Sequence, residues 1–355
     1  MIYKTGGVMM NEVMERLINE ASPAIAYRVK RDIKQEKLSW EEEQNYLDQI
    51  YTELKVQMVL SWQNPDGYFG TRLHTAPSRS KVWTHEGCVR YLLEMGLTKE
   101  HEEVRKALEV MTCPGWGKEC ENSRAAQVIK YEMIRASLFA QAGYQNEEMI
   151  TKWVDDALTA FRHIAEAECY EDIAYENKDH KFIFKEDKFI PVIYHLRILA
   201  FTESWRTREN LEMLRTAYSK LYQWLPLPPM YYKSKGQMIA PLGNICVPVN
   251  QNFIDEFGFA WFHIYELSAR MGMLDGDSPF RQHFEELKKS ILEYGDKASE
   301  LQVKRKNAYT GWSGYSGLAL ESQWRKPIQI MHDFMFRILL IEKYSGTLEG
   351  EEVCR

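Results

Sequence analysis

Residues 63–97 read QNPDGYFGTRLHTAPSRSKVWTHEGCVRYLLEMGL, and the interpretation of the rest of the chain starts from them. The stretch is a glycine-punctuated turn with aromatic residues, a loop with histidines, and a segment that begins polar and becomes apolar. The run PDG at 65–67 is a strong turn signal. Glycine-aromatic turns recur at 113–117 and 309–315. The pattern predicts a unit of helix pairs that is repeated along the chain.

Apolar residues recur at helical spacing, and no segment shows a convincing period-two pattern, so the chain is predicted to be all-α. Ser22 before Pro23 indicates a helix start, and Ser39 with Glu42 indicates a capping box. The expected helices are 11–35 with a break at Ser22-Pro23, 40–62, 83–97, 99–111, 123–142, 146–166, 189–204, 207–224, 252–271, 278–294 and 322–344. Residues 168–187 are expected to be irregular, and the proline-rich segment 225–250 to be a lid or cavity lining.

Five or six helix pairs, roughly 50 to 65 residues apart, can build an open solenoid or a closed ring. Units of unequal length, with loops after alternate helices, favour the ring. We therefore expect an (α/α)5–6 toroid with a central cavity. It would form a single domain over residues 20–345, after an N-terminal extension at 1–19 and before a disordered tail at 346–355.

The composition narrows the classes of partner. A net charge of −6 argues against nucleic acid, which requires a basic face. No segment reaches the roughly 20 apolar residues of a membrane span, and no signal peptide is recognised, so a cytoplasmic protein is expected. The aromatic share of 13% fits either the lining of a cavity for a small, hydrophobic substrate or packing between crowded helices.

The cysteines give no metal or disulfide pattern. Six are scattered without a C-x-x-C spacing, which is typical of reduced, small apolar fillers. His85 and Cys88, three residues apart, would supply half of a zinc site, but two ligands do not hold zinc. No metal and no cofactor are expected.

Residues 63–70, QNPDGYFG, are similar to the Q-x-x-D-G-x-W-G turn of the α/α-toroid superfamily of squalene-hopene-type terpene cyclases and protein prenyltransferases. The run SQWR at 322–325, which leads into an apolar helix, also fits. The chain resembles the short, single-barrel bacterial members over most of residues 20–345. The resemblance implies a toroid in which Gln63 and Asp66 bond neighbouring helix ends while Phe69 packs the turn.

The catalytic motifs of that superfamily do not transfer to this chain. The cyclases protonate an alkene with a D-x-D-D aspartate, whereas residues 153–156 read WVDD, on a helix expected to be outer and solvated. The prenyltransferases hold zinc through a D-x-C pair, and no such pair occurs. The resemblance therefore indicates the fold more strongly than an activity.

Asp255 is the first candidate for a catalytic acid. It lies in the run NFIDEFGFAW at 252–261, whose apolar neighbours would raise its pKa and keep it protonated. The alternative is a carboxylate that stabilises a helix N-terminus.

Two further residues are candidates for acid–base work. His85 would serve as a base or proton shuttle near neutral pH, although a histidine at a helix start is more often a capping or surface group. Glu132, or Glu86, would pair with Asp255 in a glycosidase-like arrangement. Candidate substrate-binding residues, mostly near the starts of expected inner helices, are His74, Trp83, Glu86, Arg124, Tyr194, His195, Trp261, His263, Trp312, Tyr315, Trp324 and Arg325.

Three functions remain open on these residues. The first is an acid-initiated, cyclase-like enzyme with a hydrophobic, isoprenoid-type substrate in an aromatic-lined cavity. The second is a carbohydrate-active barrel, such as a glycosidase, lyase or epimerase, with two carboxylates about 5 to 10 Å apart. The third is a toroid that binds a ligand without catalysis.

Overall fold

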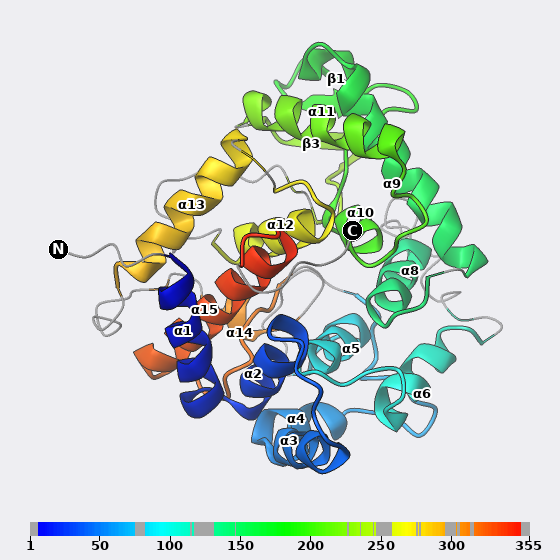
Figure 1. Cartoon of the computed structure of the whole chain (residues 1–355). Coiled ribbons are helices and arrows are strands. Elements are labelled where there is room, and N and C mark those ends of the chain that lie inside the picture. The colour runs from blue at the N-terminus through cyan, green and yellow to red at the C-terminus, as the bar shows by residue number, and fades with distance from the viewer. Residues whose placement is uncertain are drawn as a thin grey trace.

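The computed structural model describes residues 6–74, 82–113, 116, 131–145, 147–225, 227–234, 236–243, 245, 258–274, 276, 278–294, 303, 306–312 and 316–348. The chain is mostly helical (Figure 1). Its helices are α1 (Gly6–Glu20), α2 (Pro23–Arg28), the π-helix η1 (Val29–Ile33), α3 (Trp40–Thr52), α4 (Leu54–Leu60), α5 (His85–Glu94), α6 (Glu102–Val110), α8 (Tyr131–Gln141), α9 (Glu148–Glu166), the 3₁₀ helix η2 (Tyr170–Asp172), α10 (Ile193–Ala200), α11 (Arg208–Trp224), α12 (Gly258–Arg270), α13 (Pro279–Leu292), α14 (Lys306–Thr310) and α15 (Pro327–Tyr344).

The predicted helix starts at Ser22 and Ser39 are confirmed. The Ser22 hydroxyl accepts from the backbone N–H of Ile25, and α2 begins at the following proline. Ser39 and Glu42 bond each other's backbone N–H groups at 2.9 and 3.2 Å, which is the predicted capping box. The helix expected over 40–62 is broken at Glu53, whose extended backbone separates α3 from α4.

The all-α prediction is wrong in one place, because a small four-stranded sheet lies in the two segments expected to be irregular. Its order is β1-β2-β3-β4, and only the central β2–β3 pair is parallel. Its strands are β1 (Ala174–Glu176), β2 (Phe182–Phe184), β3 (Met230–Ser234) and β4 (Gln237–Ile239). Strands of three to five residues are too short to show an alternating pattern.

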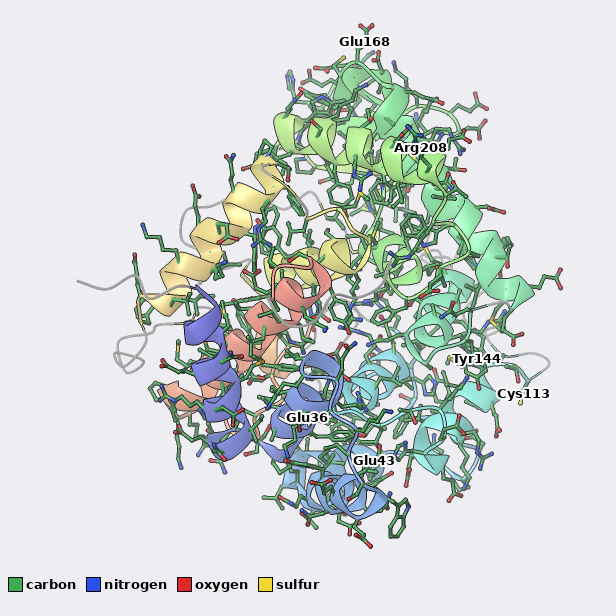
Figure 2. All side chains as sticks on the ribbon, viewed as in Figure 1. Glu36, Glu43, Cys113, Tyr144, Glu168 and Arg208 are labelled. Carbon is green, nitrogen blue, oxygen red and sulfur yellow. The ribbon has the colours of Figure 1, made fainter. Side chains whose placement is uncertain are left out.

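One set of helices packs in succession, each helix on the next, and a second set covers it. Helix α10 packs on α8 and α12, α12 packs on α15, and α15 contacts α2. Helices α9 and α11 pack on each other, and α9 also covers α10. In Figure 1, α8, α10, α12 and α15 lie nearer the middle of the molecule than α9, α11 and α13. Figure 2 shows side chains such as Glu168 and Arg208 at the periphery, where they are exposed.

The beginning of the described chain is bonded to its end. Helix α1 packs on α15, and the backbone N–H of Ser22 donates to Glu321 at 3.1 Å. Arg28 of α2 forms an ion pair with Glu94 of α5 at 2.7 Å. These contacts join segments that are far apart in sequence into one buried core.

The glycine-rich turn at 63–70 is fixed between α5 and α6. Phe69 is fully buried, and the Gln63 side chain donates to the carbonyl of Glu103 in α6 at 2.8 Å. Asp66 was expected to bond a neighbouring helix end, but it accepts from Tyr68 within its own turn at 2.9 Å. Among the described helices, none combines the length and apolarity needed to cross a membrane.

Candidate functional site

The start of α5 places a buried carboxylate beside a loop histidine. Thr84 caps the helix by accepting from the N–H of Gly87 at 3.2 Å. The backbone N–H groups of His85 and Glu86, which have no partner within the helix, donate to the carbonyls of residues 72 and 73 at 2.9 and 3.1 Å. The strand-like segment before His74 is therefore held against the first turn of α5, where Glu86 lies.

Glu86 receives hydrogen bonds from three residues of two segments, the loop at His74 and helix α10. Its Oε2 accepts from Nδ1–H of His74 at 2.7 Å and from the hydroxyl of Tyr194 at 3.2 Å. Its Oε1 accepts from Arg197 at 3.3 Å. Glu86 has no exposed surface, and burial alone would raise its pKa. His74, followed by Arg197 and Arg90, outweighs burial and lowers the pKa, so the carboxylate is ionised.

His74 keeps one ring nitrogen open. Its Nδ1 is bound to Glu86, and the Tyr194 oxygen lies 3.2 Å from the same nitrogen. Its Nε2 is buried and has no hydrogen bond with any residue of the described ranges. A carboxylate that accepts from Nδ1–H orients the neutral ring and leaves the lone pair on Nε2 to accept a proton. The same carboxylate stabilises the imidazolium that then forms.

His85, the adjacent candidate base, is occupied at both ring nitrogens. Its Nδ1 accepts from the N–H of Phe69 at 3.0 Å, and its Nε2–H donates to the carbonyl of Ala107 at 3.1 Å. The ring stacks on Tyr68 with the centroids 4.2 Å apart. Burial lowers the pKa of His85 to about 4, so the ring is neutral. In the structure His85 ties the turn at 63–70 to α5 and α6.

Arginine side chains surround the cluster further along the helices. Arg90, one turn after Glu86, donates to the carbonyl of Ser316 at 3.1 Å and lies over the ring of Trp312. Burial and then the charge of Arg197 lower the pKa of Arg90 to about 9. His263 donates to the carbonyl of Gly317 at 2.6 Å.

The charges of three buried arginines act on His263. Burial, followed by the charges of Arg90, Arg197 and Arg337, lowers the pKa of His263 well below its ordinary value. His263 is therefore a neutral donor that contributes no charge.

A second carboxylate lies two turns along the same helix. Glu94 accepts from Arg28 at 2.7 Å, from Arg337 at 2.8 Å and from Gln141 at 3.2 Å. Arg337 also pairs with Glu266 of α12 at 2.9 Å. Burial raises the pKa of Glu94, but Arg337 and Arg28 outweigh burial and lower it strongly.

Several other predicted site residues lie away from this cluster. His195 accepts from the N–H of Val192 at 3.2 Å and contacts Asp156 of α9 at 3.1 Å, so it faces α9 rather than His74. The indole N–H of Trp324 donates to Asp333 at 2.6 Å. Arg325 is exposed.

Glu132 also lies at the surface. Its side chain is 60% exposed, and it contacts Lys152 at 3.6 Å. Asp255, Arg124 and Tyr315 lie outside the described residues.

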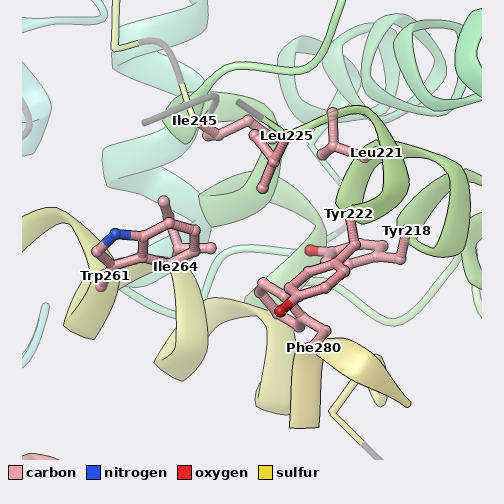
Figure 3. A pocket seen from close by; sticks show the side chains of 8 residues that line it. All are labelled: Tyr218, Leu221, Tyr222, Leu225, Ile245, Trp261, Ile264 and Phe280. Atoms are coloured by element: carbon pink, nitrogen blue, oxygen red, sulfur yellow. The ribbon is translucent and has the colours of Figure 1, made fainter. Parts of the chain in front are cut away.

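Trp261 lines a small apolar pocket between α11, α12 and α13 (Figure 3). Tyr218, Tyr222 and Phe280 line it with Trp261, together with aliphatic side chains. Its cavity volume is about 20 Å³, which is room for about one water molecule.

Trp83 and Trp312 both contact Tyr91 edge-on, with ring centroids 5.3 and 5.5 Å from the Tyr91 ring. Trp312 is fully buried.

Over the described ranges, no three His, Cys, Asp or Glu side chains are grouped so that they could hold a metal ion. Cys88 is a buried free thiol, and Cys113 is exposed at the periphery in Figure 2.

The structure thus brings together three residues singled out in the sequence, His74, Glu86 and Tyr194, and adds Arg197 and Arg90. The two arginines could have been found from helical spacing, because each lies one turn after a predicted site residue. Comparison of the chain with models of protein families, with curated proteins and with solved structures gave no match.

Proposed function

We propose that this protein is an enzyme in which His74, oriented by Glu86, moves a proton to or from a substrate. One observation carries the proposal: the carboxylate binds Nδ1 of His74, while Nε2 is buried without a partner in the described part of the chain. Groups arranged in this way act as general bases and, once protonated, as general acids. Histidine is the side chain that most often serves in both roles.

Tyr194 and Arg197 support the dyad from α10. Burial and the charge of Glu86 raise the pKa of Tyr194 well above its ordinary value, so its hydroxyl remains a donor to Glu86. Arg197 bonds the other carboxylate oxygen and helps to keep Glu86 ionised. An ionised Glu86 stabilises the imidazolium that forms when His74 takes up a proton.

We propose a polar substrate, as in the lyases and epimerases of the carbohydrate-active alternative. The support is the buried charge around the dyad, where Arg90, Arg197 and Glu86 replace the apolar lining that a hydrocarbon substrate requires. Proton abstraction from a sugar carbon next to a carbonyl or carboxylate requires one base and nearby cations, which matches this set of residues.

We further propose that the helices close into an α/α toroid. Support comes from the packing of α5 on α8, α8 on α10, α10 on α12, α12 on α15 and α15 on α2, together with the Arg28–Glu94 ion pair between α2 and α5. In such a ring the first turns of α5 and α10 would lie at the same end, where Glu86 and Tyr194 meet.

The second candidate is the cyclase-like enzyme acting on a hydrophobic, isoprenoid-type substrate. The aromatic pocket at Trp261 favours it, although a volume of about 20 Å³ is far smaller than an isoprenoid chain. Asp255, the expected acid, lies outside the described residues.

The test is proton exchange from deuterated water into candidate substrates. The wild-type protein would be incubated in D₂O with uronates and aldoses, and separately with geranyl diphosphate, farnesyl diphosphate and squalene. We expect deuterium in a sugar carbon, detected by NMR. His74→Gln should lower that rate by about 100-fold or more.

The control variant is His180→Gln, because the His180 side chain is 88% exposed, and it should leave the rate unchanged. Glu86→Gln should lower the rate and shift its pH profile, since the amide no longer stabilises a protonated His74. Turnover of an isoprenoid that does not depend on His74, with no exchange into sugars, would refute the proposal and leave the second candidate.

A further inference from the structure

Lys55 of α4 lies against two aromatic rings. Its ammonium nitrogen is 5.7 Å from the ring centroids of both Trp83 and Tyr91, which meet edge-on. Lys55 is half-buried and makes no hydrogen bond or ion pair with the residues that the structure describes.

Other polar groups near Lys55 also lack a partner among the residues that the structure describes. Within the described ranges, the hydroxyl of fully buried Tyr91 has no hydrogen bond, and neither does the buried Oε2 of Glu53. The indole N–H of Trp312, whose ring contacts Tyr91, is unpaired in the same way. Buried polar groups are normally bonded, so several open ones around one amine indicate a place for a ligand.

The charged groups that face Lys55 are Glu53, at the break before α4, and Asp333 of α15. Burial lowers the pKa of Lys55 by more than the charges of Asp333 and Glu53 raise it. Burial, with the charges of Glu321 and Asp333, raises the pKa of Glu53 to about 7. Near neutral pH a larger part of the amine is therefore neutral than in a surface lysine, and part of Glu53 is protonated.

We propose that Lys55 is a nucleophilic amine that forms a Schiff base with a small aldehyde or ketone seated against Trp83 and Tyr91. The site uses residues other than His74 and Glu86, and it does not depend on the function proposed for them. A lysine in an apolar, aromatic setting is a known way to activate an amine for this chemistry.

The step is balanced without an oxidant or a reductant. The lone pair of the lysine nitrogen forms a bond to the carbonyl carbon while the C=O π bond breaks, and one N–H proton passes to the carbonyl oxygen, which accepts a hydrogen bond from the Tyr91 hydroxyl. Protonated Glu53 then gives its proton to the carbinolamine hydroxyl, which leaves as water as the C=N bond forms, and the carboxylate takes the second N–H proton back from the nitrogen. One amine and one carbonyl yield one imine and one water.

The experiment is reductive trapping of the full chain at about pH 7. Benzaldehyde or pyruvate would be added with sodium cyanoborohydride, and modified lysines would be identified by peptide mass mapping over time. We expect Lys55 to be modified several-fold faster than Lys152, which is 69% exposed, because a lowered pKa raises the neutral fraction of the amine. Lys55→Arg should abolish the fast adduct, whereas Lys106→Arg on α6 should not.

A second measurement separates reactivity from accessibility. Lysines methylated with ¹³C-formaldehyde report their individual pKa values by NMR, and Lys55 should titrate below the exposed lysines. The proposal is overturned if Lys55 is trapped no faster than Lys152, if the fast adduct persists in Lys55→Arg, or if Lys55 titrates with or above the exposed lysines. The last result would assign Lys55 a cation–π contact alone.

Discussion

The first and the last turn of α5 carry the same side chain in different surroundings. At the last turn, Glu94 is bonded by Arg28 and Arg337, which are charged at every accessible pH. At the first turn, Glu86 is bonded by His74, whose other ring nitrogen has no partner in the described part of the chain. A carboxylate whose main partners are fixed cations can only hold the fold, whereas one that orients a histidine can take part in chemistry.

The largest effect is expected when the charge of Glu94, at the last turn of α5, is removed. Glu94→Gln leaves Arg28 and Arg337 buried without their counter-charge, and we expect the free energy of unfolding to fall by about 3 to 5 kcal/mol. Urea denaturation would measure it. The control is Glu109→Gln, whose ion pair with Arg105 is exposed and should cost at most about 1 kcal/mol. An equal loss of unfolding free energy in the two variants would show that the ion pairs of Glu94 do not stabilise the fold.

The same contrast applies to the two histidines. Both ring nitrogens of His85 are hydrogen-bonded, whereas Nε2 of His74 has no partner among the described residues. The folded pKa of His85 is about 4, below the ordinary value near 6.5, so the unfolded chain binds the proton first as the pH falls. The stability that neutral His85 contributes above about pH 6.5 is therefore lost as the pH falls toward 4. Between pH 7 and pH 5 the wild type should lose about 2 kcal/mol more than His85→Gln.

The measurement is urea denaturation of both proteins at the two pH values. Groups that titrate in both, such as His283, cancel in the difference. A cost of His85→Gln that is the same at pH 7 and pH 5 would contradict a neutral, buried His85.

A smaller effect tests how tightly the end of α5 is packed. Gly96 has φ of 101°, and an added Cβ would lie 2.9 Å from the ring of Tyr27. Gly143 has φ of 90°, but an added Cβ there meets nothing within 4 Å. Both alanine variants carry the backbone strain, so Gly96→Ala should cost about 1 to 2 kcal/mol more than Gly143→Ala because of the overlap. Equal melting temperatures for the two variants would mean that Tyr27 moves aside freely.

The smallest effect concerns a residue that the sequence suggested for catalysis. Glu132 is exposed, so Glu132→Gln should change the free energy of unfolding by less than about 0.5 kcal/mol. It should also leave deuterium exchange into the substrate unchanged. A loss of exchange with normal stability would move the site from the Glu86 end of α5 toward the start of α8.

Local rules were sufficient for the helix starts at Ser22 and Ser39, because a cap such as Ser39 with Glu42 involves neighbours in sequence. They misplaced uncapped starts, such as those of α10 and α15, by four or five residues. They could not give the sheet, since β2 and β3 pair across more than forty residues through strands of a few residues. The phase of the expected inner helices singled out His74, Glu86 and Tyr194.

The roles within that set could not be predicted from the sequence. Which nitrogen of His74 stays open, and that both nitrogens of His85 are used, depends on partners such as Phe69 and Ala107 that only the fold brings near. Lys55 carried no motif, and its aromatic neighbours come from segments about thirty residues away.

The ion pair between Glu94 and Arg337 spans 243 residues, and that separation sets the order in which the protein can mature on the ribosome. At roughly 5 to 20 residues per second, Glu94 and Arg28 wait on the order of tens of seconds before Arg337 has been synthesised. During that time the nascent chain exposes surfaces that α15 later covers. Chaperones and proteases would therefore meet this protein mainly before its last helix emerges, and ribosome-bound chains that stop short of Arg337 should be digested far faster than the finished one.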